Sequence, residues 1–383
     1  MLQSEEGCGI LELKRGITRI NIEGDGRLEL SGSPQASIHD LAREMRLHIN
    51  EVHEMGNVFG IGWLPLGLQP LHGDDEIEYA PRERYRIFTH YGNPALTAMD
   101  MKRTNGFTTN VGYKDEKSAI RMAQTAFRIL PIVGAMYASS CLDTGKPGKY
   151  LDMRRWCVKN YSPERTGIPE NILDPDFSLA SWVEFYGNLP VILTKIDGVT
   201  KAVDKKITFK QWMENGMDGR FPTMEDFDTH VKTTWSDMRM RPSYLEYRVA
   251  DSTPFRYGLS QPAFIKGLLL DPKNWDAVEE MTLDCTYEDI VAADKKAWTS
   301  GLKTKMKGKT LLSYAQDLIK ISNESLHNFK VLDGNGHDES IFLAPLKEQI
   351  HIRESSLSTE ILGLWETDWQ RNYKNLLAWC EER

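Results

Sequence analysis

The stretch Ile20-Asn-Ile-Glu-Gly-Asp-Gly-Arg-Leu-Glu-Leu-Ser31 decides the predicted fold. Apolar and polar residues alternate on both sides of the Gly-Asp-Gly turn at 24–26, and this pattern is typical of a β-hairpin. One face is apolar, and the other carries Glu23 and Glu29 beside Asn21 and Arg27. For any single hairpin, a solvated outer face is the simpler explanation of such a polar side.

The same alternation returns in two segments far along the chain. Residues 107–113 put Asn110 on the face opposite the apolar residues, and residues 244–251 put Glu246 and Arg248 there. If the three segments pair in one antiparallel sheet, their polar sides line a concave surface. Such a surface has the groups needed to hold divalent cations and a phosphorylated nucleotide.

Composition favours a chain that acts on a small substrate. The 383 residues are 40% hydrophobic, which supplies a sizeable core, and 47 basic against 55 acidic residues give a formal charge of −8. An acidic balance argues against nucleic acid or an anionic membrane as the main partner. The five cysteines lack metal-ligand or disulfide-scaffold spacing, no signal peptide is recognisable, and the apolar run 129–138 is too short to span a bilayer. We therefore expect a cytoplasmic protein in a reducing compartment.

The order of the predicted elements indicates an α+β fold. Strands are expected mainly in the first two-thirds of the chain and helices towards its end, and no linker or repeat divides residues 1–383, which we treat as one domain. The individual expectations are a helix from Ser37 to Gly56, a buried strand over 58–68, a helix over 119–138 kinked at Pro131, an exposed hairpin over 195–205 and a last helix over 358–380.

Arginines accompany the polar segments. Arg103 lies at the mouth of the second polar strand, Arg154 belongs to an Arg-Arg pair, and Arg165 closes the same basic segment. The forked donors of a guanidinium suit a substrate carboxylate or polyphosphate. Surface ion pairs account for the same residues equally well, so both interpretations stay open at this point.

Several ordered segments carry a resemblance to a known family, and together they cover nearly the whole chain. They are the hairpin with Gly-Ser-Pro at 32–34 and Ile38-His39, residues 103–110, residues 130–140 with Gly-Lys-Pro at 145–147, Met153-Arg154, Arg-Thr-Gly at 165–167, residues 208–230, and residues 244–251 with Pro254, Arg256 and Pro-Ala-Phe at 262–264. In these segments the chain resembles the plant and proteobacterial type of glutamate-cysteine ligase, whose catalytic domain is related to glutamine synthetase.

The resemblance implies a fold and a reaction. The fold would be a curved antiparallel sheet with a polar concave face, backed by helices. The reaction would be ATP-dependent formation of a γ-glutamyl amide through a γ-glutamyl phosphate, which is the first step of glutathione biosynthesis when cysteine is the amine. The substrates would be ATP, glutamate and cysteine or another amine, with Mg²⁺ as the cofactor. The protein would be a monomer or a homodimer without a nucleic-acid or membrane partner.

The resemblance also implies roles for individual side chains. Three carboxylates are the expected Mg²⁺ ligands: Glu23, Glu29 and Glu246. Three polar residues are expected to bind substrate or a phosphate oxygen: Arg103, Asn110 and Arg154. Among the arginines expected in catalysis, Arg154 would bind the α-carboxylate of glutamate, and Arg248 or Arg165 would stabilise the acyl phosphate.

The chain departs from the family pattern at three places. The family normally has an upstream strand with a Glu-His-Glu-like triplet, which this sequence lacks. Thr108 and Gly112 stand where the family has glutamine and aspartate, and Thr89 stands for an arginine. Three hypotheses follow: a glutamate-cysteine ligase, a ligase of the same mechanism that uses a different amine, and a non-catalytic relative that binds a ligand or a partner ligase. The changes at Thr108 and Gly112 favour the second, but we rank the three narrowly in the order given, because Glu23, Glu29, Glu246 and the arginines are retained.

Overall fold

The hairpin predicted at 20–31 forms within a four-stranded antiparallel sheet. In the computed structural model, which describes residues 2–3, 10–80 and 82–382, β3 (Thr18–Ile22) pairs with β4 (Leu28–Ser31) so that Asn21 lies opposite Glu29. β2 (Ile10–Arg15) pairs with the other side of β3, and β1 (Leu2–Gln3) completes the order β1-β2-β3-β4. β2 is missing from the predicted elements, although alternation over 11–14 followed by a glycine at 16 is a hairpin signal, and Gly16 adopts φ 62° at the turn.

The other two polar segments pair with each other in a separate sheet. β5 (Thr109–Gly112) and β11 (Tyr244–Tyr247) are antiparallel, with Asn110 opposite Glu246, and β10 (Met238–Met240) gives the order β10-β11-β5. Buried and accessible residues alternate along β5 and β11 as expected. The prediction of a single sheet is wrong, since none of the described strands joins the two. Alternation determines which side of a strand is polar, but it does not determine which edges meet.

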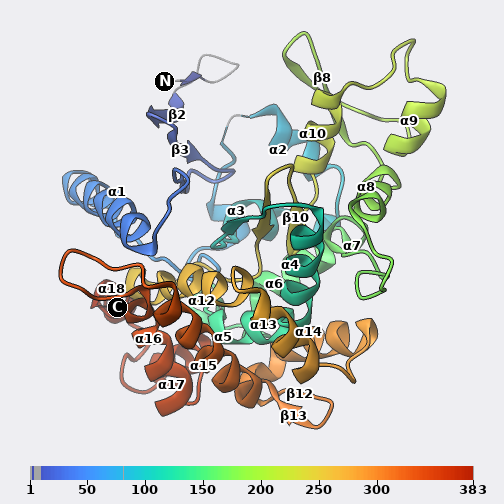
Figure 1. The fold of residues 1–383 in the computed structure, drawn as a ribbon. Coiled ribbons are helices and arrows are strands. Elements are labelled where there is room, and N and C mark those ends of the chain that lie inside the picture. The colour runs from blue at the N-terminus through green and yellow to red at the C-terminus, as the bar shows by residue number, and fades with distance from the viewer. Residues whose placement is uncertain (1, 4–9, 81, 383) are drawn as a thin grey trace.

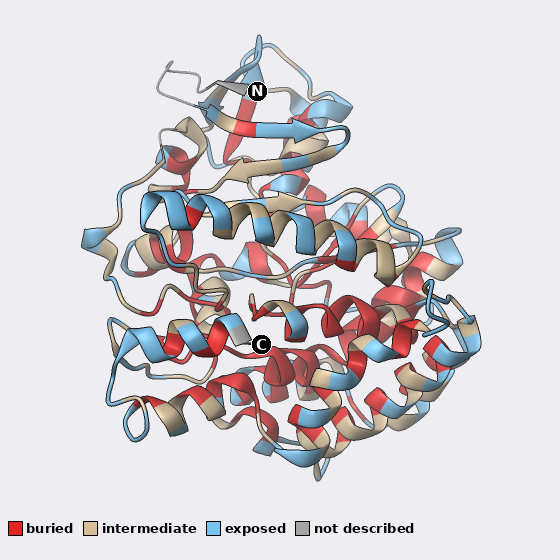
Figure 2. Cartoon of the chain, turned by 90° about the vertical axis from the view of Figure 1, so that its left-hand side faces the viewer, coloured by how far each residue is buried: buried red, intermediate tan, exposed pale blue. Residues whose placement is uncertain are grey.

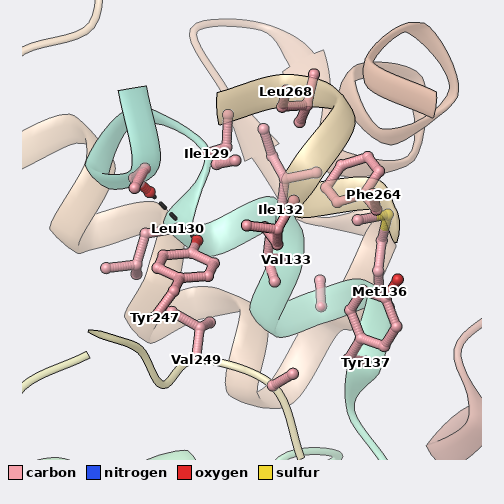
Figure 3. Close-up of a cluster of buried hydrophobic side chains, with 14 of the residues drawn as sticks. Ile129, Leu130, Ile132, Val133, Met136, Tyr137, Tyr247, Val249, Phe264 and Leu268 are labelled. Atoms are coloured by element: carbon pink, nitrogen blue, oxygen red, sulfur yellow. Dashed lines mark hydrogen bonds between the residues drawn. The ribbon is translucent and has the colours of Figure 1, made fainter. Parts of the chain in front are cut away.

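The helix predicted over 119–138 is two helices, and the second is the centre of the main core. α4 (Glu116–Arg128) starts after Asp115, whose side chain accepts the Ser118 N–H, and α5 (Leu130–Tyr137) has Pro131 in its first turn. All eight residues of α5 are buried. Figure 3 shows this cluster, with the Tyr247 hydroxyl donating to the Ala126 carbonyl at 3.2 Å. The core therefore supports the apolar side of β11.

Helices from the last third of the chain surround α5 and fill the lower part of Figure 1. α12 (Ser260–Leu269) packs on α15 (Leu311–Phe329), and α14 (Tyr287–Ser300) and α15 both contact α5. The predicted last helix is instead α17 (Leu357–Trp365) and α18 (Tyr373–Glu382), because the chain turns between them at Gln370 and Arg371, both with positive φ. The other elements here are α11 (Phe255–Gly258), α13 (Pro272–Met281), η2 (Gly301–Lys303), β12 (Lys305–Met306), β13 (Lys309–Thr310), η3 (Glu339–Leu343), α16 (Ala344–Lys347) and η4 (Glu348–Ile352).

The helix predicted from Ser37 to Gly56 begins as expected and ends later. The Ser37 side chain accepts the Asp40 N–H, and α1 (Ile38–Phe59) continues to Gly60, which ends it in the left-handed conformation. The strand predicted over 58–68 is wrong, because Val58 is an exposed residue of α1 and residues 61–68 form only an isolated bridge. Figure 2 views the side on which α1 lies in Figure 1 and shows buried residues concentrated in the helical half below it.

Short helices and hairpins connect these parts, and the architecture is α+β. The predicted exposed hairpin over 195–205 is confirmed. No helix in the described residues is long and apolar enough to cross a membrane. The remaining elements are η1 (Asp74–Glu76), α2 (Glu83–Thr89), α3 (Pro94–Arg103), β6 (Leu142–Asp143), β7 (Lys146–Pro147), α6 (Met153–Tyr161), α7 (Pro163–Thr166), α8 (Leu179–Gly187), β8 (Leu193–Ile196), β9 (Val199–Ala202), α9 (Phe209–Asn215) and α10 (Met224–Lys232).

Candidate active site

A cavity of about 2480 Å³ is lined by the polar sides of both main sheets. One wall comes from β3 and β4, and another comes from β5 and β11 with the residues that follow it. Single small-molecule pockets usually measure roughly 300–1,000 Å³, so this cavity has room for more than one substrate. Seven of the eight predicted site residues line it: Glu23, Glu29, Arg103, Asn110, Arg154, Glu246 and Arg248.

Glu29 and Glu23 lie close enough on the first wall to influence each other's charge. Water reaches Glu29 in the cavity, yet protein surrounds it on several sides, and this burial raises the pKa of Glu29. The Glu23 carboxylate raises it further, whereas a hydrogen bond from Ser31 and the charges of Arg248 and Arg84 oppose the rise. Two neighbouring carboxylates of this kind form a site that favours a cation.

The second of these carboxylates is held by α2. The Tyr85 hydroxyl donates to Glu23 Oε2 at 2.8 Å, and Arg84 Nη2 donates to Glu23 Oε1 at 3.2 Å. Burial is the main reason that the pKa of Tyr85 is raised to about 12, so its hydroxyl keeps its proton and remains a donor. These contacts orient Glu23 while leaving its side chain 26% exposed towards the cavity.

Asn110 and Glu246 lie side by side on the second wall, as their pairing in β5 and β11 requires. Glu246 Oε2 is 3.0 Å from Arg239 Nη1 and 3.9 Å from Arg248 Nη1. Its present partners are therefore arginines. Its role as a metal ligand stays a prediction, because no group of three or more histidine, cysteine or acidic side chains within the described ranges is arranged to hold a metal ion.

Arg248 is a cavity cation with few partners in the protein. Its guanidinium makes no hydrogen bond to the described part of the chain, and its nearest acid is Glu246 at 3.9 Å. Burial lowers the pKa of Arg248 to about 10, the charge of Arg239 adds to the decrease, and the charges of Glu246 and Glu29 oppose it. At neutral pH this side chain is a cation in the cavity with all its donors available to an anion.

Arg154 enters the cavity from the start of α6 and is already partly engaged. Its guanidinium donates to the carbonyl oxygens of Arg248 and Val249 at 3.0 and 3.2 Å, and it approaches the buried Asp251 carboxylate at 3.4 Å. A Cβ atom built on Gly106 would lie 2.3 Å from Arg154 Nη2, so glycine leaves the space that the guanidinium occupies. Arg154 therefore joins the end of β11 to the 104–106 loop and keeps only part of its donor capacity for a ligand.

Two predicted arginines have structural roles. Arg165 is fully buried, lies outside the cavity lining, and donates to Thr233, the Pro190 carbonyl and Tyr91. Arg103 touches the cavity, but the carboxylates of Asp74 and Asp143 neutralise its charge at 3.2 and 2.7 Å. Protein acceptors occupy the terminal nitrogens of both guanidinium groups, so this geometry gives no support to the substrate roles predicted for Arg103 and Arg165.

Sequence reasoning misses several polar residues that line the same cavity. Glu12 of β2 lies opposite Asn21, and recognising the alternation of β2 would have found it. Arg239 lies between two methionines in β10, a three-residue strand too short to give a clear pattern. Asp100 lies on α3, where helical spacing gives no sign of its orientation.

Comparisons with known proteins agree with this arrangement. The model of the family described as glutamate-cysteine ligase family 2 matches residues 2–364. The chain is 30% identical to a chloroplastic glutamate-cysteine ligase of Nicotiana tabacum, over 96% of this chain and 70% of the relative. It is 29% identical to ligase B of Oryza sativa subsp. japonica (96% and 73%) and 28% identical to the Arabidopsis thaliana ligase (95% and 69%). By the extent of these matches, the chain belongs to the glutamate-cysteine ligase family.

Proposed function

We propose that the protein is an ATP-dependent ligase that joins the γ-carboxylate of glutamate to an amine, with cysteine as the amine. The observation that carries the proposal is the position of Glu29. Its carboxylate interacts electrostatically with both Glu23 and Arg248, and all three residues line one cavity. An acidic pair beside an unsatisfied arginine suits a reaction in which a metal-bound phosphoryl group is transferred to a carboxylate. We treat residues 1–383 as one catalytic domain, which the family match over 2–364 supports.

The donor set fits Mg²⁺ that arrives with ATP. Mg²⁺ in phosphoryl-transfer sites is commonly held by one or two carboxylates together with substrate phosphates, so Glu23 and Glu29 suffice as its protein ligands. Burial is the main cause of the raised pKa of Glu29 and the charge of Glu23 adds to it, and a divalent cation would offset both effects. Bound there, the ion would offset the charge of the phosphates.

The chain's own residues then have distinct tasks. The γ-carboxylate oxygen of glutamate attacks the terminal phosphorus of ATP, ADP leaves, and the amine then attacks the acyl carbon and releases phosphate. Arg248 would bind the acyl phosphate, where its unpaired donors meet developing negative charge. Arg154 would bind the α-carboxylate with its remaining donors, and Asn110 would donate to a phosphate oxygen. The reaction requires no protein nucleophile.

Phosphate release tests the proposal. Glutamate and cysteine together are expected to stimulate ATP- and Mg²⁺-dependent phosphate release and to yield a γ-glutamyl product. Replacing Glu29 by glutamine is expected to lower turnover by about 100-fold or more, because one of two charged metal ligands becomes neutral. The matched control is Glu214→Gln on the exposed side of α9, which should retain full activity. An unchanged rate in Glu29→Gln would remove this residue from the site.

A substitution beside Arg154 tests its assigned position without removing its charge. Gly106→Ala places a methyl group where Arg154 Nη2 now lies, so the guanidinium must move. Because the displaced guanidinium loses contacts with the Arg248 and Val249 carbonyls and with buried Asp251, we also expect a loss of stability of about 1–3 kcal/mol, which thermal melting of the same sample measures. We expect the apparent affinity for glutamate to fall by about 10-fold, on the order of one charge-assisted hydrogen bond. Gly363→Ala, whose Cβ has open space, is the control, and equal glutamate KM values in the two variants would contradict the role.

A different amine acceptor is the second candidate. Thr108 and Gly112 give the β5 wall a smaller and less charged surface than the family's glutamine and aspartate. A panel of amines assayed by product mass would decide, and a larger kcat/KM with an amine other than cysteine would favour it. The relatives' names place them in chloroplasts, so a cytoplasmic location and a monomeric or homodimeric state remain predictions.

A further inference from the structure

Asp100 is a buried carboxylate at the cavity that no other described group satisfies. It lies in the last turn of α3, is 7% exposed and contributes to the cavity lining. Its side chain makes no hydrogen bond or ion pair with residues 2–3, 10–80 or 82–382, although the great majority of buried polar side chains have a partner. A buried acceptor that lacks a donor in the protein and borders a cavity indicates a donor from a ligand.

The groups around Asp100 define what that donor can be. Three arginines interact electrostatically with the Asp100 carboxylate without contacting it: Arg154 of α6, Arg27 of the β3–β4 turn, and Arg248. On the side of the core, the charge of Asp100 contributes to the raised pKa values of Tyr79, Tyr161 and Cys157. Burial outweighs the three cations and raises the pKa of Asp100 to about 7. The three arginines are therefore too far from Asp100 to compensate the cost of removing its charge from water. A cation in direct contact with the carboxylate would compensate that cost.

We propose that Asp100 receives the α-ammonium group of glutamate beside the α-carboxylate that Arg154 binds. An α-amino acid carries opposite charges on one carbon, and an aspartate and an arginine that line the same cavity and whose charges interact offer their complement. The assignment rests on the proposed function, and it makes Asp100 a specificity-determining residue. With Asp100 in this role, the cavity would favour an amino diacid over a diacid that lacks the amino group.

Calorimetric binding of glutamate and of glutarate, with Mg²⁺ and a non-hydrolysable ATP analogue, tests this assignment. Wild-type protein is expected to prefer glutamate by at least about 10-fold, because the site's buried carboxylate stays unpaired with glutarate. Asp100→Asn should lose this preference, mainly through weaker glutamate binding. Asp176→Asn, at an exposed position away from the cavity, should retain it. A preserved preference in Asp100→Asn overturns the assignment, and wild-type protein that binds neither diacid overturns the proposed function as well.

The pH dependence and a chemical trap separate Asp100 from a merely structural residue. Ionisation of Asp100 near pH 7 should strengthen glutamate binding between pH 6 and 8 and leave glutarate binding equal or weaker, and Asp100→Asn should abolish this difference. When hydroxylamine replaces cysteine as the acceptor, Asp100→Asn should still raise the KM for glutamate. A variant impaired only with cysteine would place Asp100 on the acceptor amine and overturn the assignment. The pKa of Asp100 in the folded protein lies above its usual value, so the ionised carboxylate destabilises the ligand-free protein above pH 7. At pH 8, Asp100→Asn should therefore have a higher melting temperature than wild type.

Discussion

Replacing Arg248 by alanine is expected to lower kcat/KM by about 100- to 1,000-fold while the protein stays folded, because the variant loses the donor aimed at a developing anion. Its guanidinium has no hydrogen-bond partner in the described residues, so its loss breaks no bond of the fold. Removing a positive charge also relieves repulsion from Arg239, the second cause of its lowered pKa. Activity and stability should therefore change in different directions or by very different amounts.

Steady-state kinetics and thermal melting of the same samples measure the two effects. Arg248→Lys retains a positive charge but loses the forked donors, so it should recover only part of the rate. Arg353→Ala, which removes an exposed arginine paired with Glu348 at the surface, is the control and should leave kcat/KM unchanged. If Arg248→Ala melts well below wild type, or retains full activity, then Arg248 belongs to the structural arginines.

The polar faces of the strands could be predicted from the sequence, whereas their assembly could not. Alternation identified the cavity sides of β3, β4, β5 and β11, including the neighbours Asn110 and Glu246. Which edges pair depends on tertiary packing, so the expected single sheet proved to be two that face the same cavity. Length limits the signal as well, because β10 has only three residues.

The arginines show where sequence reasoning stops. Arg103, Arg165 and Arg248 have the same chemistry in the sequence, and they differ only in whether the fold supplies acceptors for their donors. Asp74 and Asp143 satisfy Arg103, carbonyl and hydroxyl oxygens satisfy Arg165, and Arg248 has no hydrogen-bond partner in the described residues. In four of these contacts the acceptor lies between 25 and 68 residues from the arginine in the sequence. A local sequence pattern cannot predict pairing over such a separation.

The same accounting of partners identifies the position where one substitution should cost the most stability. Arg155 on α6 is 3% exposed, and its Nη1 and Nη2 atoms lie 2.6 Å from carboxylate oxygens of Asp237 and Asp294. Asp152 lies at 3.9 Å, and Lys159 also pairs with Asp237. This cluster joins α6, α14 and the segment before β10 at the wall of the cavity, where Arg155, Lys159 and Asp237 are lining residues. The positive charges hold the pKa of Asp237 at about 2, against a burial effect that would raise it.

Arg155→Met is expected to destabilise the protein by about 3–5 kcal/mol or to prevent folding, because it keeps the apolar volume but leaves buried carboxylates with too little positive charge. The loss should be larger at pH 8 than at pH 5. Without Arg155 the carboxyl groups would bind protons more tightly, so acid can neutralise them, whereas at pH 8 they must stay charged or take up protons at a cost. Denaturant unfolding at both pH values measures this difference in the free energy of unfolding, with Arg353→Met as the exposed control.

Adding Asp294→Asn to Arg155→Met should recover part of the lost stability, since it removes one of the unpaired charges. The result to compare is the loss of stability caused by Asp294→Asn alone in the wild-type protein. If Asp294→Asn costs the same in the Arg155→Met background, the two side chains act independently, and the cluster does not hold these elements together through charge.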